Sequence, residues 1–129
     1  MKAKKKILII DDEPDYVAVL QEHLEREGFE VAAAYDGIEG LRKVEAVSPD
    51  AIVLDVMMPD KDGYEVCAEL KADKRFAAIP VIMLTAVASH VPSTRYSHYE
   101  GMTMEAEDYI PKPASWEQIL ASLRRVLHL

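Results

Sequence analysis

Residues 7–12 read ILIIDD: four apolar residues, three of them isoleucines, are followed at once by two carboxylates. A short apolar run rich in β-branched residues is typical of a strand that is buried on both faces. Two further segments have the same form, because residues 51–55 read AIVLD and residues 81–85 read VIMLT. Each run ends on a polar residue, so the pattern predicts buried strands that carry polar groups at one end.

The stretches between these runs have the apolar spacing of amphipathic helices. We expect helices over residues 14–27, 37–47 and 63–72 and at the end of the chain, where Gly28 ends the first and Ser115 caps the last. The apolar residues at helical spacing are Val17, Leu20 and Leu24; Ile38, Leu41 and Val44; Val66, Cys67 and Leu70; and Trp116, Ile119, Leu120, Leu123 and Leu127. Two more strands are expected over residues 29–34 and 108–111. A longer loop and a helix over residues 94–104 are expected between the last two strands.

Strands that alternate with helices indicate βαβ units, which build a mostly parallel sheet with helices on both faces. The expected fold class is therefore α/β with a doubly wound sheet. A chain of 129 residues fits one domain. We expect a single domain over residues 1–129, with no output domain in this chain.

Composition excludes several classes of protein. The chain has 15 Lys and Arg against 23 Asp and Glu, a net charge of −8, which disfavours direct binding to nucleic acid or to an anionic membrane. Cys67 is the only cysteine, so an internal disulfide and a multi-cysteine zinc site are excluded. The apolar runs are too short for a transmembrane helix, and no signal-peptide core follows the basic N-terminus, so a cytoplasmic location is expected.

Polar residues that could carry chemistry gather at the carboxyl ends of the expected strands, where doubly wound sheets bind ligands. They are Asp11 and Asp12, Asp55, Thr85 and, after the fifth strand, Lys112. Three carboxylates in one crevice repel unless a cation neutralises them, and Mg²⁺ suits carboxylate and phosphate oxygens. A carboxylate nucleophile, a metal, an ammonium and a hydroxyl are the parts needed to receive a phosphoryl group.

Four segments together resemble the receiver domain of two-component response regulators. They are residues 7–14 (ILIIDDEP), 48–63 (SPDAIVLDVMMPDKDG), 79–86 (IPVIMLTA) and 108–113 (DYIPKP), and the likeness covers essentially the whole chain. The resemblance implies a flavodoxin-like fold, in which a five-stranded parallel sheet of order 2-1-3-4-5 carries five helices. It also implies a signalling function that depends on phosphorylation.

The resemblance assigns a role to each residue of the acidic site. Asp55 would accept the phosphoryl group from the phosphohistidine of a histidine kinase. Asp12 would bind Mg²⁺ directly, Asp11 would hold a metal-bound water, and the backbone carbonyl of Met57 would complete the protein ligands, with Asp55 itself also in the metal site. The Met57 side chain would overhang the site.

Two further residues would contact the phosphoryl group, and a third would change its orientation when the group is present. Thr85 and Lys112 are the expected contacts, and Tyr109 matches the aromatic switch residue that turns inward when Thr85 moves. The Lys112–Pro113 peptide bond would be cis. The new charge would change the face formed by the fourth helix, the fifth strand and the fifth helix, for partner binding or phosphorelay.

The chain departs from the family pattern between Thr85 and Lys112, which are separated by a few residues more than is usual. The extra length falls around residues 87–100, where the fourth helix begins, so we expect either that activation is transmitted differently here or that the output partner is unusual. A smaller departure is Ala114, where a large apolar residue is common.

The expected partners are a sensor histidine kinase or a phosphotransfer protein and an unidentified downstream protein, with the chain a monomer or a weak dimer. The domain would catalyse only its own phosphorylation and dephosphorylation, so it is not expected to be an enzyme that turns over an outside substrate. One alternative is a phosphohydrolase with an aspartyl nucleophile, although Met57 occupies the position of its usual second Asp. Another is an interaction module that works without phosphorylation.

Each of these residues also has a simpler interpretation. Asp11 and Asp12 could cap the first helix, Thr85 could bond its own backbone, Lys112 could be solvated, and Tyr109 could be ordinary half-buried packing. The Met57 and Met58 side chains are interpreted as packing groups, because a thioether is too soft for Mg²⁺. Cys67 is interpreted as a core residue, and the four histidines are not expected to bind a metal. Tyr96, Tyr99 and Met102 are expected to pack in the core. The N-terminal lysines are expected to form a solvated tail.

Overall fold

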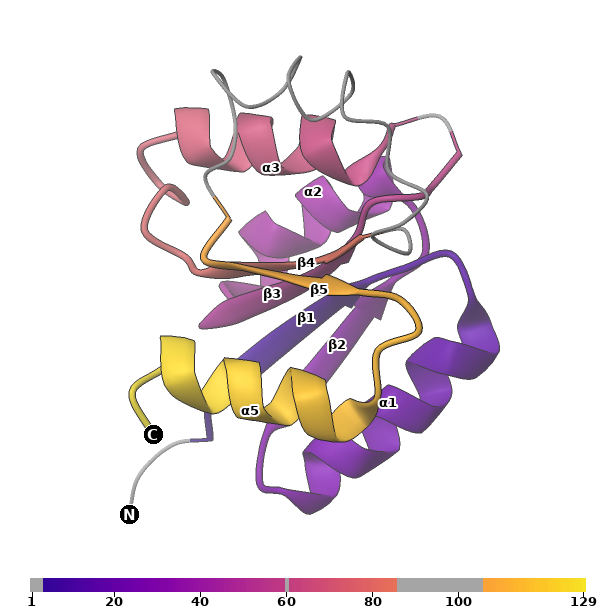
Figure 1. Ribbon diagram of the computed structural model, residues 1–129. Coiled ribbons are helices and arrows are strands. Elements are labelled where there is room, and N and C mark those ends of the chain that lie inside the picture. The colour runs from indigo at the N-terminus through magenta and orange to yellow at the C-terminus, as the bar shows by residue number, and fades with distance from the viewer. Residues whose placement is uncertain (1–3, 60, 86–105) are drawn as a thin grey trace.

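The computed structural model describes residues 4–59, 61–85 and 106–129, and its centre is a parallel sheet (Figure 1). The strands are β1 (Lys6–Ile10), β2 (Glu30–Ala34), β3 (Ala51–Asp55), β4 (Val81–Thr85) and β5 (Asp108–Pro111), in the order β2-β1-β3-β4-β5. The helices are α1 (Pro14–Arg26), α2 (Gly37–Val47), α3 (Gly63–Ala72) and α5 (Trp116–Val126). The expected α/β fold and strand order are confirmed. The helix expected over residues 94–104 and the packing expected for Tyr96, Tyr99 and Met102 lie outside the described residues.

Helices cover both faces of the sheet, with α1 and α5 on one side and α2 and α3 on the other (Figure 1). This arrangement explains why the first strand is apolar throughout. Alternate residues of β1 face opposite layers, so Ile7 and Ile9 pack in the core beneath α1 and α5, whereas Leu8 and Ile10 pack beneath α2 and α3. Both faces of the strand therefore exclude water.

The helix α2 packs differently from its expected pattern. Ile38 was expected at a core-facing spacing, but its side chain is 48% exposed, and the buried residues of the helix are Gly37, Gly40 and Val44. A Cβ atom on Gly40 would lie 2.7 Å from Cδ1 of Ile10. The helix therefore approaches β1 at Gly40 and approaches Lys61 and Val66 at Gly37, because only a residue without a side chain permits this closeness.

The ends of the other elements agree with the sequence patterns to within one residue. Gly28 takes φ of +98° after α1, as expected of a residue that stops a helix. Ser115 caps α5, because its hydroxyl oxygen accepts a hydrogen bond from the Gln118 N–H. The Ser115 N–H in turn donates a hydrogen bond to the side-chain oxygen of Gln118. These helix ends could be predicted from the sequence because the residues that form each end lie within a few positions of one another.

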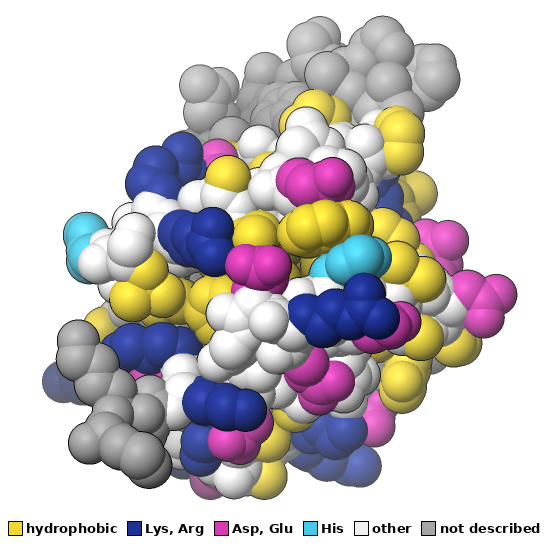
Figure 2. Space-filling view, turned by 90° about the horizontal axis from the view of Figure 1, so that it is seen from below, with side chains coloured by type: hydrophobic (Ala, Val, Ile, Leu, Met, Phe, Trp, Pro, Cys, Tyr) yellow, Lys and Arg dark blue, Asp and Glu magenta, His cyan; other side chains and the backbone are white. Residues whose placement is uncertain are grey.

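The layer of α1 and α5 presents a mixed surface. Seen from below, Lys and Arg side chains are interspersed with Asp and Glu side chains and with hydrophobic groups (Figure 2). Across the two helices, His23 stacks on Trp116 with ring centroids 4.3 Å apart, and Arg124 pairs with Glu27 at 2.8 Å. No helix in the described ranges is long and apolar enough to cross a membrane.

The parallel register brings the polar strand ends to one edge of the sheet. Ile10 lies beside Leu54, and Asp55 lies beside Leu84. Thr85 lies beside Pro111, so Lys112 leaves the sheet next to Thr85. Residues from four distant segments therefore meet at the carboxyl edge.

Candidate functional site

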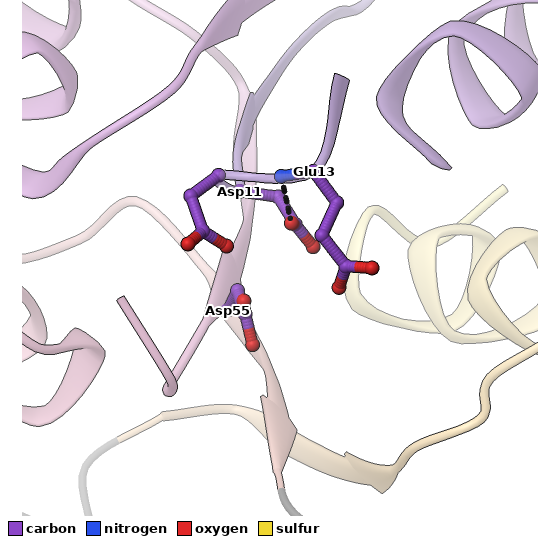
Figure 3. A group of neighbouring side chains, drawn as sticks. Asp11, Glu13 and Asp55 are labelled. Atoms are coloured by element: carbon purple, nitrogen blue, oxygen red, sulfur yellow. Dashed lines mark hydrogen bonds between the residues drawn. The ribbon is translucent and has the colours of Figure 1, made fainter. Parts of the chain in front are cut away.

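Four carboxylates converge at this edge of the sheet. One oxygen from each of Asp11, Asp12, Glu13 and Asp55 lies within 4.8 Å of the others. The labelled carboxylates of Asp11, Glu13 and Asp55 lie around one small space (Figure 3). Asp11 is held there by its backbone N–H, which donates to the Ala34 carbonyl at 3.0 Å, and by its Oδ1, which accepts from the Glu13 N–H at 2.9 Å.

Asp55, the last residue of β3, has two carboxylate oxygens in different environments. Its Oδ1 accepts a hydrogen bond from the Met57 N–H at 3.2 Å and lies 3.3 Å from Nζ of Lys112. Its Oδ2 is buried and has no hydrogen-bond partner among the described residues. Burial, together with the nearby Asp11 charge, raises the pKa of Asp55 from 3.8 to about 6.

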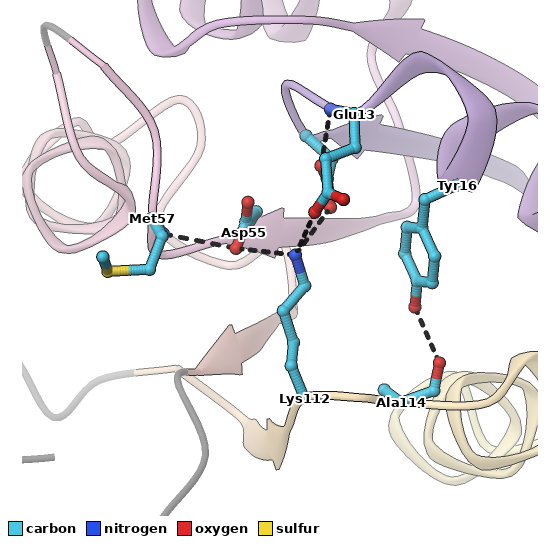
Figure 4. Close-up of polar contacts among 7 residues, drawn as sticks. Glu13, Tyr16, Asp55, Met57, Lys112 and Ala114 are labelled. Atoms are coloured by element: carbon cyan, nitrogen blue, oxygen red, sulfur yellow. Dashed lines mark hydrogen bonds and ion pairs between the residues drawn. The ribbon is translucent and has the colours of Figure 1, made fainter. Parts of the chain in front are cut away.

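Lys112 supplies the positive charge of the site. Its Nζ lies 3.0 Å from Glu13, 3.3 Å from Asp55 and 3.5 Å from Asp11 (Figure 4). Burial opposes its charge, but the hydrogen bond to Glu13 and the neighbouring carboxylates raise the pKa of Lys112 above its usual value, so it stays an ammonium. The Lys112–Pro113 peptide bond is cis, as expected. Lys112 is therefore an ion-pair partner here and not a solvated side chain.

The donor set suits a hard divalent cation. Among the described residues, four carboxylates face one ammonium, so negative charge is in excess, and one buried Asp55 oxygen has no hydrogen-bond partner. Oxygen ligands of this kind are those that Mg²⁺ prefers. The N-cap position of α1 is held by Glu13 and not by Asp11 or Asp12, and Asp11 bonds the backbone N–H of that N-cap residue.

The remaining two expected site residues lie on β4 and β5. Thr85 ends β4, its side chain is buried, and its carbonyl accepts a hydrogen bond from the Lys112 N–H at 2.9 Å. Tyr109 on β5 is half-buried against the core beneath α2 and α3, and its hydroxyl accepts a hydrogen bond from the Ala106 N–H at 3.2 Å. Half-buried packing thus describes Tyr109 in this state, and its inward turn stays a prediction.

The methionine side chains differ from each other. Met58 is buried as expected, whereas Met57 is 55% exposed, so its interpretation as a packing group is wrong. The reason is its place in the loop after β3, where only its backbone faces Asp55 (Figure 4). With Asp12 and Pro59, Met57 lines a hollow at the rim of the site.

Two residues at the site were not identified from the sequence. Glu13 approaches Lys112 more closely than either aspartate does, and its place directly after Asp12 is a signal that could have found it. Tyr16 lies with its ring 5.5 Å from Lys112 Nζ, and no local pattern marks it. Of the other candidates, Cys67 is buried as expected, and His90 and His98 lie outside the described residues.

Comparison with known proteins adds an independent finding. The family described as response regulator receiver domain matches residues 7–124. A curated relative, the alkaline phosphatase synthesis transcriptional regulatory protein PhoP of Bacillus subtilis, is 42% identical over 95% of this chain and 48% of its own length. The chain thus spans about half the length of the curated relatives it matches.

Solved structures of similar proteins have the same fold. The signal receiver domain of a signal transduction histidine kinase from Syntrophus aciditrophicus gives a TM-score of 0.84 at 32% identity, over 96% of this chain and 90% of that one. The chemotaxis protein CheY4 of Vibrio cholerae gives a TM-score of 0.82 at 27% identity, over 96% of this chain and 99% of that one.

Proposed function

The chain belongs to the response regulator receiver domain family, the signalling domain of two-component systems, and we propose that it is a phosphorylation switch whose acceptor is Asp55. The observation that carries the proposal is the environment of one carboxylate. Asp55 has a buried oxygen that finds no hydrogen-bond partner in the part of the chain that the structure describes, beside an ammonium and within a group of further carboxylates. We also propose that residues 1–129 form a single receiver domain.

The proposed reaction is transfer of a phosphoryl group to Asp55. An Asp55 oxygen attacks the phosphorus of a phosphohistidine on a histidine kinase or a phosphotransfer protein. An O–P bond forms, the N–P bond breaks, and its electron pair leaves with the imidazole nitrogen. A general base is not required, because a carboxyl group with a pKa of about 6 is mostly ionised at neutral pH.

The carboxylates around Asp55 are proposed to hold Mg²⁺. Asp12 would bind it directly, Asp11 through a water, and Asp55 and the Met57 carbonyl would complete the protein ligands. The ion would supply charge neutralisation for the carboxylates and the incoming phosphoryl oxygens. Asp11 keeps its orientation through its bond from the Glu13 N–H, which restricts where the remaining oxygen can point.

Lys112 and Thr85 are proposed to bind the phosphoryl group once it is on Asp55. The Lys112 ammonium, already 3.3 Å from Asp55, would pair with a phosphoryl oxygen, and the Thr85 hydroxyl would donate to another. Movement of Thr85 would draw Tyr109 inward and shift the face that includes β5 and α5 toward a state that binds a downstream protein. Hydrolysis of the acyl phosphate, aided by the same residues, would reset the switch.

The direct test is labelling with acetyl phosphate and Mg²⁺, followed by intact-mass measurement. We expect the mass of one phosphoryl group on the wild-type chain and no label on Asp55→Asn. The matched control is Asp73→Asn, because Asp73 lies just after α3 and pairs with Arg75 at the surface, and this variant should label normally. Undiminished labelling of Asp55→Asn would contradict the assignment of the acceptor. Continuous turnover of a phosphate ester would favour the phosphohydrolase alternative.

A further inference from the structure

Tyr16 touches the segment that carries Lys112 at two points. Its hydroxyl donates a hydrogen bond to the Ala114 carbonyl at 2.9 Å, and its ring centroid lies 5.5 Å from Nζ of Lys112. Tyr16 stands in the first turn of α1, and its side chain lies alongside Lys112 and points toward Ala114 (Figure 4). The two contacts fall on either side of Pro113, so one aromatic side chain bridges α1 to both neighbours of that proline.

We propose that Tyr16 is a positioning residue for Lys112, whose ring and hydroxyl together keep the ammonium near Asp55. The proposal deepens the proposed function, because its effect on phosphorylation rests on that function. Tyr16 is not assigned any contact with the phosphoryl group. It acts through Lys112.

The Lys112 side chain needs a neighbour that restricts its position, because its ammonium can pair with more than one carboxylate. Its four-carbon stem is flexible, and Glu13, its nearest carboxylate, is 62% exposed, whereas Asp55 is 1% exposed. Without a neighbour on the Tyr16 side, the ammonium would gain rotamers that lead it away from Asp55 into water, where it could still pair with the exposed Glu13. An aromatic ring near the ammonium attracts the cation and fills the space that those rotamers would use.

The hydroxyl bond acts on the backbone. By binding the Ala114 carbonyl, Tyr16 restrains the chain two residues after Lys112. Burial raises the pKa of Tyr16 to about 12, so the hydroxyl keeps its proton and remains a donor at neutral pH. Ring and hydroxyl can be separated by substitution, because Tyr16→Phe removes only the hydrogen bond and Tyr16→Leu removes both contacts.

The first measurement is the initial rate of labelling by acetyl phosphate at saturating Mg²⁺, in a double-mutant cycle with Lys112→Ala. We expect Tyr16→Leu to slow labelling roughly three- to tenfold and Tyr16→Phe about two- to threefold. In the Lys112→Ala background, Tyr16→Leu should change the rate by less than about twofold, because the residue it positions is gone. Tyr35→Leu is the matched control, since Tyr35 is an exposed tyrosine outside the site, and it should label at the wild-type rate.

The second measurement does not depend on phosphorylation. In ¹³C-lysine-labelled protein, the methylene protons of Lys112 should carry an upfield ring-current shift in the wild type and in Tyr16→Phe. Tyr16→Leu should lose that shift while its thermal unfolding stays cooperative. If the wild type takes no label, the proposed function fails and this spectrum still decides the role of Tyr16. An unchanged Lys112 spectrum in Tyr16→Leu, or an equal rate loss with and without Lys112, would overturn the proposal.

Discussion

The Asp55 carboxyl group is buried beside a second buried carboxylate, Asp11, and this placement opposes ionisation. Its pKa is raised to about 6 in the folded chain, against 3.8 as the usual value. A carboxyl with a raised pKa binds its proton more tightly in the folded state than in the unfolded state. Its favourable contribution is therefore present below about pH 4 and is lost as the pH rises through about 6. At neutral pH the ionised, buried Asp55 carboxylate therefore lowers the stability of the folded chain, and a bound cation would relieve this effect.

The first prediction is that Asp55→Asn stabilises the metal-free chain at neutral pH. Removing the buried charge should raise the free energy of unfolding by about 1–3 kcal/mol near pH 7. The difference from the wild type should shrink as the pH falls through about 6 and level off below about pH 4, where Asp55 becomes protonated in both states. Urea unfolding across this pH range measures it. A difference that grows on acidification would show that the sign is wrong.

The second prediction concerns Gly63, the first residue of α3. A Cβ atom here would lie 2.8 Å from Cα of Val56 and closer still to the Asp55 carbonyl oxygen, and backbone atoms cannot move aside as a side chain can. Gly63→Ala should lower the free energy of unfolding by about 2–4 kcal/mol and displace the loop after Asp55.

Gly28→Ala is the comparison for Gly63→Ala. Among the described residues, apart from its two chain neighbours, no atom lies within 4 Å of the added Cβ, and the φ of +98° is the unfavourable feature. Its loss in urea unfolding should stay near 1 kcal/mol. Equal losses in the two variants would mean that the close contact at Gly63 is not decisive.

At the scale of elements, a buried lysine joins α3 to the starts of two strands. Lys71, whose side chain is 6% exposed, donates to the carbonyls of Ala77 and Ile79 and pairs with Glu107 at 3.1 Å. Glu107 also accepts a hydrogen bond from the Val81 N–H at 2.7 Å. This cluster lies where β4 and β5 begin, at the opposite end of the strands from the carboxylates.

The third prediction is that Lys71→Met destabilises the fold without disabling the site. It leaves two carbonyls and Glu107 without their cation, which should lower the free energy of unfolding by about 1–3 kcal/mol. Labelling of the folded fraction by acetyl phosphate should remain near the wild-type rate. Arg26→Met, which removes an exposed pair with Glu22 on α1, is the control and should cost less than about 1 kcal/mol. A loss of labelling in well-folded Lys71→Met would show that the two ends of the sheet are coupled.

At the scale of the whole molecule, the net charge of −8 is concentrated in part at one edge of the sheet, where four carboxylates converge. A cation bound there would act on the stability of the entire domain, because the site is assembled from residues on separate strands and exists only in the folded state. Metal affinity and folding stability are therefore linked.

The fourth prediction is that Mg²⁺ raises the unfolding temperature. At roughly 100 times its dissociation constant, the ion should add about 2.7 kcal/mol of stability. NaCl at equal ionic strength should give a smaller shift, because it only screens the repulsion. Asp55→Asn and Asp12→Asn should lose most of the Mg²⁺-specific part. A shift that is equal for both salts and for all variants would show that no specific cation site exists.

Much of the fold could be predicted because its signals are local or strictly periodic. Apolar runs marked the strands, Gly28 and Ser115 marked helix ends, and the polar residues after each strand marked the site. The failures have one cause. Ile38 at helical spacing indicated the inner face of α2, but the helix buries Gly37 and Gly40 instead. That burial depends on how closely Val66 of α3 approaches Gly37 and how closely β1 approaches Gly40.

The sequence alone determined that Asp11, Asp55, Thr85 and Lys112 would share one edge, since parallel strands bring their carboxyl ends together whatever the details of packing. Only the tertiary structure decided that Glu13 would be the nearest carboxylate to Lys112, that Met57 would face solvent, and that Tyr16 would bridge to Ala114. These contacts depend on the position in which each helix and loop packs against the sheet. That position follows from packing between residues far apart in the chain, and no short stretch of sequence records it.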